Sequence, residues 1–133
     1  MFVQAFTTKQ PRLLGEIVSI MQGVRVQEDL ISTVGSTLLI KAETREALAE
    51  FCIAALKRAP QTLCSEIIEA DFGADIAGDS YTNSIQLEED LEDSEMLIMF
   101  GGDGATIYGT DKKKAKAIAV NQGLKIARYN KLD

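Results

Sequence analysis

Few residues in this 133-residue chain have types and spacing that could support chemistry, and the clearest group is the glycine-rich segment Gly101–Gly104. Glycine adopts positive φ without steric cost, so such a loop can bring backbone N–H groups close to an anion. Asp103 within it could act as a base, although an aspartate in a glycine turn more often bonds to the backbone. Because the apolar runs Met96–Phe100 and Ala105–Tyr108 flank the loop, the pattern predicts a buried β-hairpin.

Other kinds of site have little support in the sequence. The chain has no histidine, which removes the usual general base and the commonest metal ligand. Cys52 and Cys64 form no close metal or redox motif. We expect them to be buried thiols in a reducing cytoplasm, and a disulfide between them is the alternative. The acidic run Glu88–Asp93 has no calcium-loop spacing, and it indicates a solvated face. We therefore expect no catalytic residue, no metal and no cofactor.

The net charge of −6 is unevenly distributed along the chain. No Lys or Arg lies between Arg58 and Lys112, whereas the segment after Lys112 is basic. This asymmetry either gives two solvated faces or lets the acidic face of one subunit meet the basic face of another. The overall acidity argues against nucleic acid as a partner. Because there is neither a signal-peptide pattern nor a run of ~18 apolar residues, we expect a cytoplasmic protein without membrane contact.

The first half of the chain alternates strand and helix signals. A strand is expected over Phe2–Phe6, and a helix with Pro11 in its first turn follows. Strands are also expected at Val24–Leu30, Thr37–Ala42 and Thr62–Ile68, and a helix capped by Thr44 and ended by Pro60 precedes the last of them. This order is that of the split βαβ, or ferredoxin-like, arrangement, in which both helices cover one face of an antiparallel sheet.

The second half has a less regular pattern. Phe72–Ser84 is expected as a loop, Ile85–Asp93 as a short acidic helix, Asp111–Ile126 as a longer helix and Ala127–Lys131 as a final strand. The sequence therefore predicts an α+β fold, a ferredoxin-like sandwich with a C-terminal ββα extension or half-repeat. The corresponding domains are residues 1–71, an acidic loop and short helix at 72–93, and the half-repeat at 94–133.

Two segments follow the same design. Ile31–Ala59 and Met96–Ala127 each consist of a strand, a glycine-containing turn, a second strand and an alanine-rich helix. In this alignment Gly35 corresponds to Gly104, and Thr44 corresponds to Thr110 or Asp111. The similarity indicates either an internal duplication or two unrelated ββα units that look alike.

The Gly101–Gly104 loop resembles the GGDG element of the NAD kinase and diacylglycerol kinase superfamily. The resemblance implies that the glycines let the backbone approach phosphate and that Asp103 lies near the reacting groups. It covers four or five residues, and Ala105 stands where that family usually has Thr. A helix follows the loop in that family, whereas Ala105–Thr110 here has the pattern of a returning strand.

Gly35–Ile68 resembles the second half of a bacterial microcompartment shell domain, with its Gly-Ser turn, apolar strand, polar link and Ala-rich helix. Gly104–Leu124 is similar to the same element in circularly permuted members of that family. The first helix, Leu13–Met21, lacks the family's small residues, and Phe72–Asp93 has no simple counterpart. The resemblance implies hexamers or trimers whose glycine-rich turns line a narrow central pore, without catalysis.

Three functions remain open at this point. The first is a self-assembling, shell-type subunit that forms a homo-oligomer. The second is a small regulatory or ligand-binding module for a metabolite or a phosphate-containing ligand, and the third is a phosphate- or nucleotide-binding enzyme. The candidate pore or ligand loops consist of Val34, Gly35, Ser36, Gly101, Gly102, Asp103 and Gly104.

Overall fold

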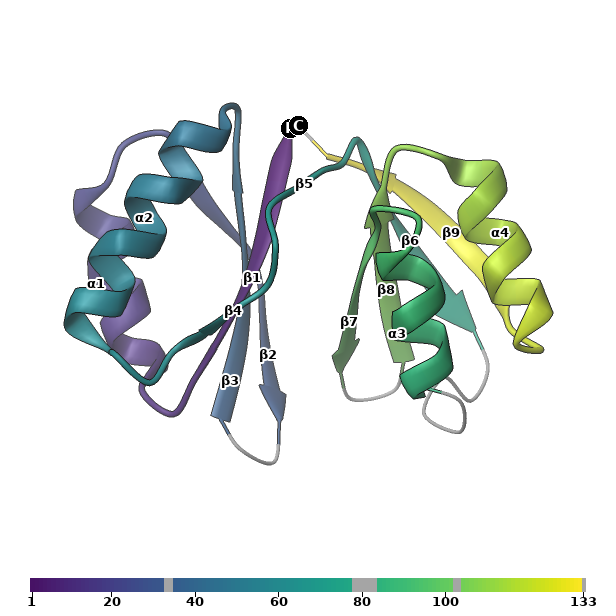
Figure 1. The fold of residues 1–133 in the computed structure, drawn as a ribbon, viewed down its shortest axis with the longest axis horizontal. Coiled ribbons are helices and arrows are strands. Elements are labelled where there is room, and N and C mark those ends of the chain that lie inside the picture. Colours follow the sequence, from purple (N-terminus) through teal and green to yellow (C-terminus); the bar gives the residue numbers. More distant parts are fainter. Residues whose placement is uncertain (33–34, 78–83, 102–103, 133) are drawn as a thin grey trace. The chain divides into compact units, whose positions relative to one another are not determined.

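The computed structural model describes residues 1–32, 35–77, 84–101 and 104–132. The chain forms two compact units, Met1–Ile67 and Ile68–Asp133 (Figure 1). The second unit therefore begins before the acidic segment that the sequence set apart as a separate region. Among the described residues, no helix has the length and apolar content needed to cross a bilayer.

The first unit has the ferredoxin-like topology that its sequence predicts. Its elements are β1 (Phe2–Thr8), α1 (Pro11–Ile20), β2 (Val24–Ser32), β3 (Gly35–Ala42), α2 (Arg45–Arg58) and β4 (Leu63–Cys64). The strands lie in the order β2-β3-β1-β4, and each neighbouring pair is antiparallel. Both helices cover one face of this sheet (Figure 1). The expected strand Thr62–Ile68 is shorter than predicted, because β4 pairs with β1 over two residues.

Local sequence signals set the helix ends in this unit. Pro11 occupies the first turn of α1, where its missing N–H costs nothing. The Thr44 hydroxyl accepts a hydrogen bond from the Ala47 N–H at 3.2 Å and caps α2. The core between helices and sheet includes the edge-to-face pair Phe6 and Phe51, with ring centroids 5.0 Å apart.

The second unit repeats the topology of the first. Its elements are β5 (Ile68–Glu69), β6 (Phe72–Ala77), α3 (Ser84–Glu92), β7 (Leu97–Gly101), β8 (Gly104–Gly109), α4 (Lys112–Asn121) and β9 (Lys125–Lys131). The sheet order is β7-β8-β6-β9, so β6-α3-β7-β8-α4-β9 matches β1-α1-β2-β3-α2-β4 element by element. The α+β class is confirmed, and the C-terminal half-repeat is extended by β6 and α3 into a complete βαββαβ unit.

Two expectations for this unit were wrong. Phe72–Ala77 is a strand, not a loop, and its Phe72, Ala74 and Ile76 side chains alternate into the core. Helix α4 ends at Asn121, not Ile126, because Gly123 adopts a φ of +75°. Ile126 therefore lies in β9 and packs against the core from there.

In each of the two long hairpins, the last paired residues are three positions apart in the sequence. Ser32 pairs with Gly35 at the end of β2-β3, and Gly101 pairs with Gly104 at the end of β7-β8. The predicted hairpin is therefore confirmed, because the strands on either side of the glycine-rich segment, β7 and β8, pair with each other. Strand β8, and not a helix, follows this loop, as the hairpin interpretation expects.

Candidate functional site

The candidate residues chosen from the sequence lie at the ends of these hairpins. Gly35 and Ser36 begin β3, while Gly101 ends β7 and Gly104 begins β8. Gly35 has a φ of +148°, and a Cβ there would meet the carbonyl oxygen of Thr8 and come within 2.8 Å of its carbonyl carbon. Glycine at this position is therefore required by the packing of the hairpin. The remaining candidates lie outside the described residues: Val34, Gly102 and Asp103.

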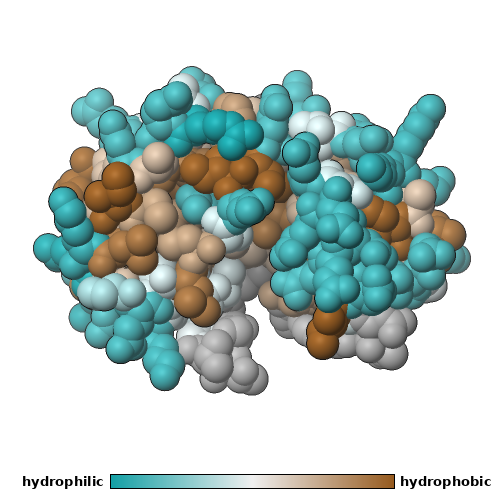
Figure 2. Space-filling model, in the orientation of Figure 1, coloured by the Kyte–Doolittle hydropathy of each residue, from teal (hydrophilic) through white to brown (hydrophobic). Residues whose placement is uncertain are grey.

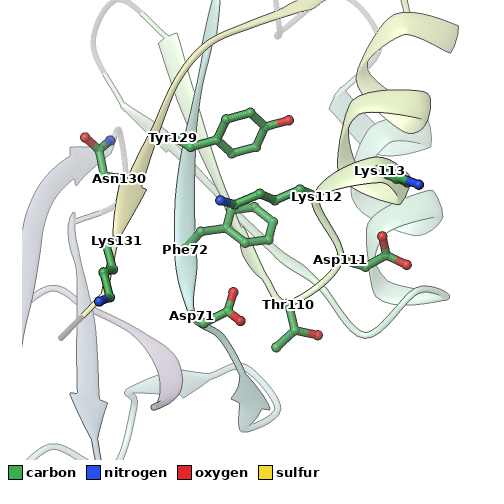
Figure 3. A pocket seen from close by; sticks show the side chains of 9 residues that line it. All are labelled: Asp71, Phe72, Thr110, Asp111, Lys112, Lys113, Tyr129, Asn130 and Lys131. Atoms are coloured by element: carbon green, nitrogen blue, oxygen red, sulfur yellow. The ribbon is translucent and has the colours of Figure 1, made fainter.

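An open groove of about 770 Å³ lies at the start of α4 in the second unit. Three segments form it: the beginning of β6, the link from β8 into α4 and the end of β9 (Figure 3). The lining residues are Asp71, Phe72, Thr110, Asp111, Lys112, Lys113, Tyr129, Asn130 and Lys131. None of them belongs to the loops chosen from the sequence.

Strand register brings these three segments together. Phe72 of β6 pairs with Gly109 at the end of β8 on one side and with Lys131 near the end of β9 on the other. The Asp71 N–H donates to the Gly109 carbonyl at 2.9 Å, and the Asp71 carbonyl accepts from the Leu132 N–H at 3.1 Å. The backbone of the groove is therefore held by ladder hydrogen bonds, and its side chains project from a fixed frame.

Two aromatic rings form the apolar part of the groove. Phe72 is 1% exposed, whereas Tyr129 is 38% exposed. Their ring centroids lie 5.6 Å apart at 75°, an edge-to-face contact. The Lys112 ammonium lies 5.2 Å from the Tyr129 centroid, within the range of a cation–π interaction. Figure 3 shows Lys112 reaching toward both rings while Lys113 points away from them.

The charges of the groove favour an anion. Three lysines and two aspartates line it. The carboxylate of Asp111 accepts a hydrogen bond from the Lys114 N–H at 3.0 Å and so acts as the N-cap of α4. The start of a helix also carries a partial positive charge. Both carboxylates oppose an anion near Lys112, so the three lysines leave the groove an excess of one positive charge over the two aspartates.

The first unit has a similar arrangement at the matching position. Arg45 is the first residue of α2, as Lys112 is of α4, and its guanidinium lies 4.9 Å from the ring centroid of Phe2. Arg45 also donates to the Ile67 carbonyl at 3.3 Å. In the first unit the Arg45 guanidinium therefore contacts both the Phe2 ring and a backbone carbonyl.

A sequence signal for the groove existed and was missed. Phe2 opens β1 and Phe72 opens the matching strand β6, and a cation directly follows the helix cap in both Thr44-Arg45 and Asp111-Lys112. The sequence alignment of the two halves reached the caps. Phe72 lies outside that alignment, because its surroundings have the sequence pattern of a loop.

A second polar cluster lies on the sheet of this unit and has a structural role. The Asp75 carboxylate accepts hydrogen bonds from Arg128 at 3.0 and 3.2 Å, Asn130 at 3.1 Å and Thr106 at 3.2 Å. It therefore links β8, β6 and β9. The described part of the chain contains no group of three or more His, Cys, Asp or Glu side chains placed to hold a metal ion.

Helix α3 carries the acidic residues that the sequence predicts to be solvated. Hydrophilic residues cover α3 on the face seen in Figure 2, while Leu87 and Leu91 anchor the helix in the core. Partial burial raises the pKa of Glu88, and the nearby Glu92 carboxylate raises it further. The charged form of Glu88 is therefore disfavoured in the folded protein, so this helix gains stability as the pH falls toward that pKa.

Comparison with known proteins finds a distant structural likeness. No protein-family model matches the chain, and no curated protein matches it. Among solved structures, the chain is similar to a microcompartments protein from Desulfitobacterium hafniense DCB, with a TM-score of 0.45 and 11% sequence identity. The match covers 98% of this chain and 93% of that chain.

Proposed function

We propose that this protein is a ligand-binding module that holds a small anionic metabolite, with a phosphate or carboxylate group, in the groove at the start of α4. The observation that supports this function most is the placement of Lys112 beside the Phe72–Tyr129 ring pair in a cavity of about 770 Å³. That volume suits a small molecule.

The groove offers each part of such a ligand a separate contact. Ammonium groups make short, charge-assisted hydrogen bonds to phosphate or carboxylate oxygens. The half-exposed face of Tyr129 can pack against a planar or apolar part of the ligand. The Asn130 side chain also lines the groove and can supply further polar contacts. Binding of this kind requires no catalytic residue, which agrees with the absence of histidine from the sequence.

Calorimetric titration with adenosine monophosphate, inorganic phosphate and adenosine tests this function. We expect the two phosphate-bearing compounds to bind and adenosine, which lacks the anion, to bind far more weakly. Lys112→Ala is expected to weaken binding about tenfold, because one charge-assisted hydrogen bond is lost. Asp71→Asn is expected to strengthen binding, because it removes a negative charge from the groove and leaves the backbone hydrogen bonds of that residue in place.

Lys116→Ala is the matched control for the lysine substitution. Lys116 lies on the same helix, is exposed and does not line the groove, so the affinity should stay within about twofold of the unsubstituted protein at constant salt. Equal weakening by Lys112→Ala and Lys116→Ala would mean that phosphate senses the overall charge of α4, and the proposal of a defined groove would then be wrong.

A second proposal is self-association as a shell-type subunit, with the hairpin ends at Gly35 and Gly104 near a pore or interface. The separation of charge favours it: the acidic, solvent-exposed side of α3 and the lysines at the start of α4 can form a heterologous contact between copies. A head-to-tail contact of this kind closes into a ring when the rotation between copies allows it.

Light scattering at low and high salt tests self-association. The wild-type chain is expected to form a homo-oligomer at low salt that dissociates as salt screens the charges. The double variant Lys114→Glu/Lys116→Glu should be monomeric at low salt, because it places acidic groups opposite acidic groups. A monomeric wild-type chain at every salt concentration contradicts this second proposal, and it leaves the ligand-binding proposal to be judged by its own titration.

A further inference from the structure

The two cysteines of the chain lie side by side in the first unit. Cys52 is on α2 and Cys64 is in β4, and their Sγ atoms are 3.6 Å apart. The expectation of two buried thiols is wrong, because Cys64 is exposed and Cys52 is partly buried. This proximity is independent of the ligand groove, which belongs to the second unit.

We propose that Cys52 and Cys64 form a reversible intramolecular disulfide that ties the edge strand β4 to helix α2. A disulfide needs its sulfur atoms at about 2.05 Å, so a short movement of the two side chains from 3.6 Å completes the bond. The exposed thiol gives a small oxidant access to the pair, and the second sulfur is already within reach of the first.

The reaction is an exchange with a low-molecular-weight disulfide such as oxidised glutathione. One cysteine, as its thiolate, attacks the oxidant and forms a mixed disulfide, and one glutathione thiol leaves. The other cysteine then loses its proton and displaces the second glutathione. The protein loses two electrons and two protons in total, and the oxidant takes them up as two thiols. Excess reduced thiol reverses both steps.

The surroundings of Cys64 disfavour its thiolate form. Although the Cys64 side chain is exposed, partial burial of its thiol raises the pKa to about 12, and the hydrogen bond with Cys52 and the charge of Cys52 raise it further. Because the thiolate is the nucleophile, the pair should react slowly at neutral pH and faster as the pH rises.

The structural consequence concerns β4, which is a short strand at the edge of the β2-β3-β1-β4 path. Only Leu63 and Cys64 belong to it, and it pairs with β1 over these two residues alone. The disulfide joins two residues that are 12 positions apart in the sequence and reduces the freedom of the unfolded chain. The disulfide therefore holds in place β4, the edge strand that follows α2 in the chain.

Mass spectrometry and thermal unfolding of the full chain test this inference. After treatment with oxidised glutathione, we expect a cross-link between the peptides on either side of Arg58, the loss of two hydrogen atoms and no labelling by a thiol reagent. The melting temperature should rise by roughly 5–15 °C and return to its starting value after reduction.

Cys64→Ser is the control for the chemistry, because its side chain is exposed and the change is small. This variant should show no cross-link and no rise in melting temperature under the same treatment, while Cys52→Ser should accept one glutathione on Cys64. The inference is overturned if wild-type protein keeps both thiols free, stops at the mixed disulfide or forms cross-links between chains.

Discussion

Replacing Gly35 by alanine is expected to lower the free energy of unfolding by about 2–4 kcal/mol. The φ of +148° at this position is one that residues with a side chain rarely adopt. The added Cβ would also lie against the backbone of Thr8. Unlike a side chain, the backbone cannot relieve this clash by changing rotamer. Either β3 or the end of β1 must shift, and the pairing of Thr8 with Ser36 is the first contact to be lost. Chemical denaturation measures the loss directly.

The same substitution at Gly15 is the matched control and should have the opposite sign. Gly15 lies within α1, and a Cβ there would meet no atom within 4 Å. Alanine favours helix over glycine, so Gly15→Ala should raise the free energy of unfolding by about 0.5–1 kcal/mol. If both variants were destabilised equally, the special backbone geometry of Gly35 would not be the cause.

The second large effect is expected at Phe72, which connects the core of the second unit to the groove. Phe72→Ala should cost about 3–5 kcal/mol, because it leaves a cavity in a core where this ring is 1% exposed. It should also weaken phosphate-ligand binding, since Tyr129 loses its edge-to-face partner. Denaturation and calorimetric titration of the same preparation measure the two effects.

Phe72→Leu separates the two roles of this side chain. Leucine fills much of the cavity, so most of the free energy of unfolding should be restored. The lost contact between the two rings should cost only about 0.5–1.5 kcal/mol in addition to the smaller apolar area that leucine buries. Binding should remain weaker than in the wild type, because Tyr129 is less well held. Wild-type affinity in a stable Phe72→Leu variant would show that the ring pair does not position the ligand.

The first unit could be predicted because its local and long-range signals agree. Pro11 and Thr44 mark the helix starts, the apolar period identifies the helices, and the order of elements leads to the observed sheet. The length of β4 could not be predicted, because an apolar run such as Thr62–Ile68 does not reveal how many of its residues find a partner.

The second unit was harder to predict because packing overrides its local signals. Gly73 gives Phe72–Ser84 the pattern of a loop, yet this glycine has a structural reason in β6. A Cβ at residue 73 would come within 2.9 Å of the Tyr108 ring on the neighbouring strand. Asp75 accepts hydrogen bonds from Arg128 across the sheet. These partners are distant in sequence, so no local pattern shows them.

The repeated aromatic and cationic positions are a sequence signal for the groove, but its full lining could not be predicted, for a similar reason. Its residues come from three segments, 71–72, 110–113 and 129–131, and only strand register brings these together. Lys112 looked like part of a basic tail, since its position beside Tyr129 depends on the fold. The proximity of Cys52 and Cys64 likewise depends on how α2 and β4 meet.

The most direct test of the ligand-binding account is a map of amide NMR shifts during titration with adenosine monophosphate. We predict that the shifts concentrate at 71–72, 110–113 and 129–131, saturate with added ligand and are reduced in Lys112→Ala but not in Lys116→Ala. Shifts that are absent, or that spread over exposed lysines without saturation, would contradict the account.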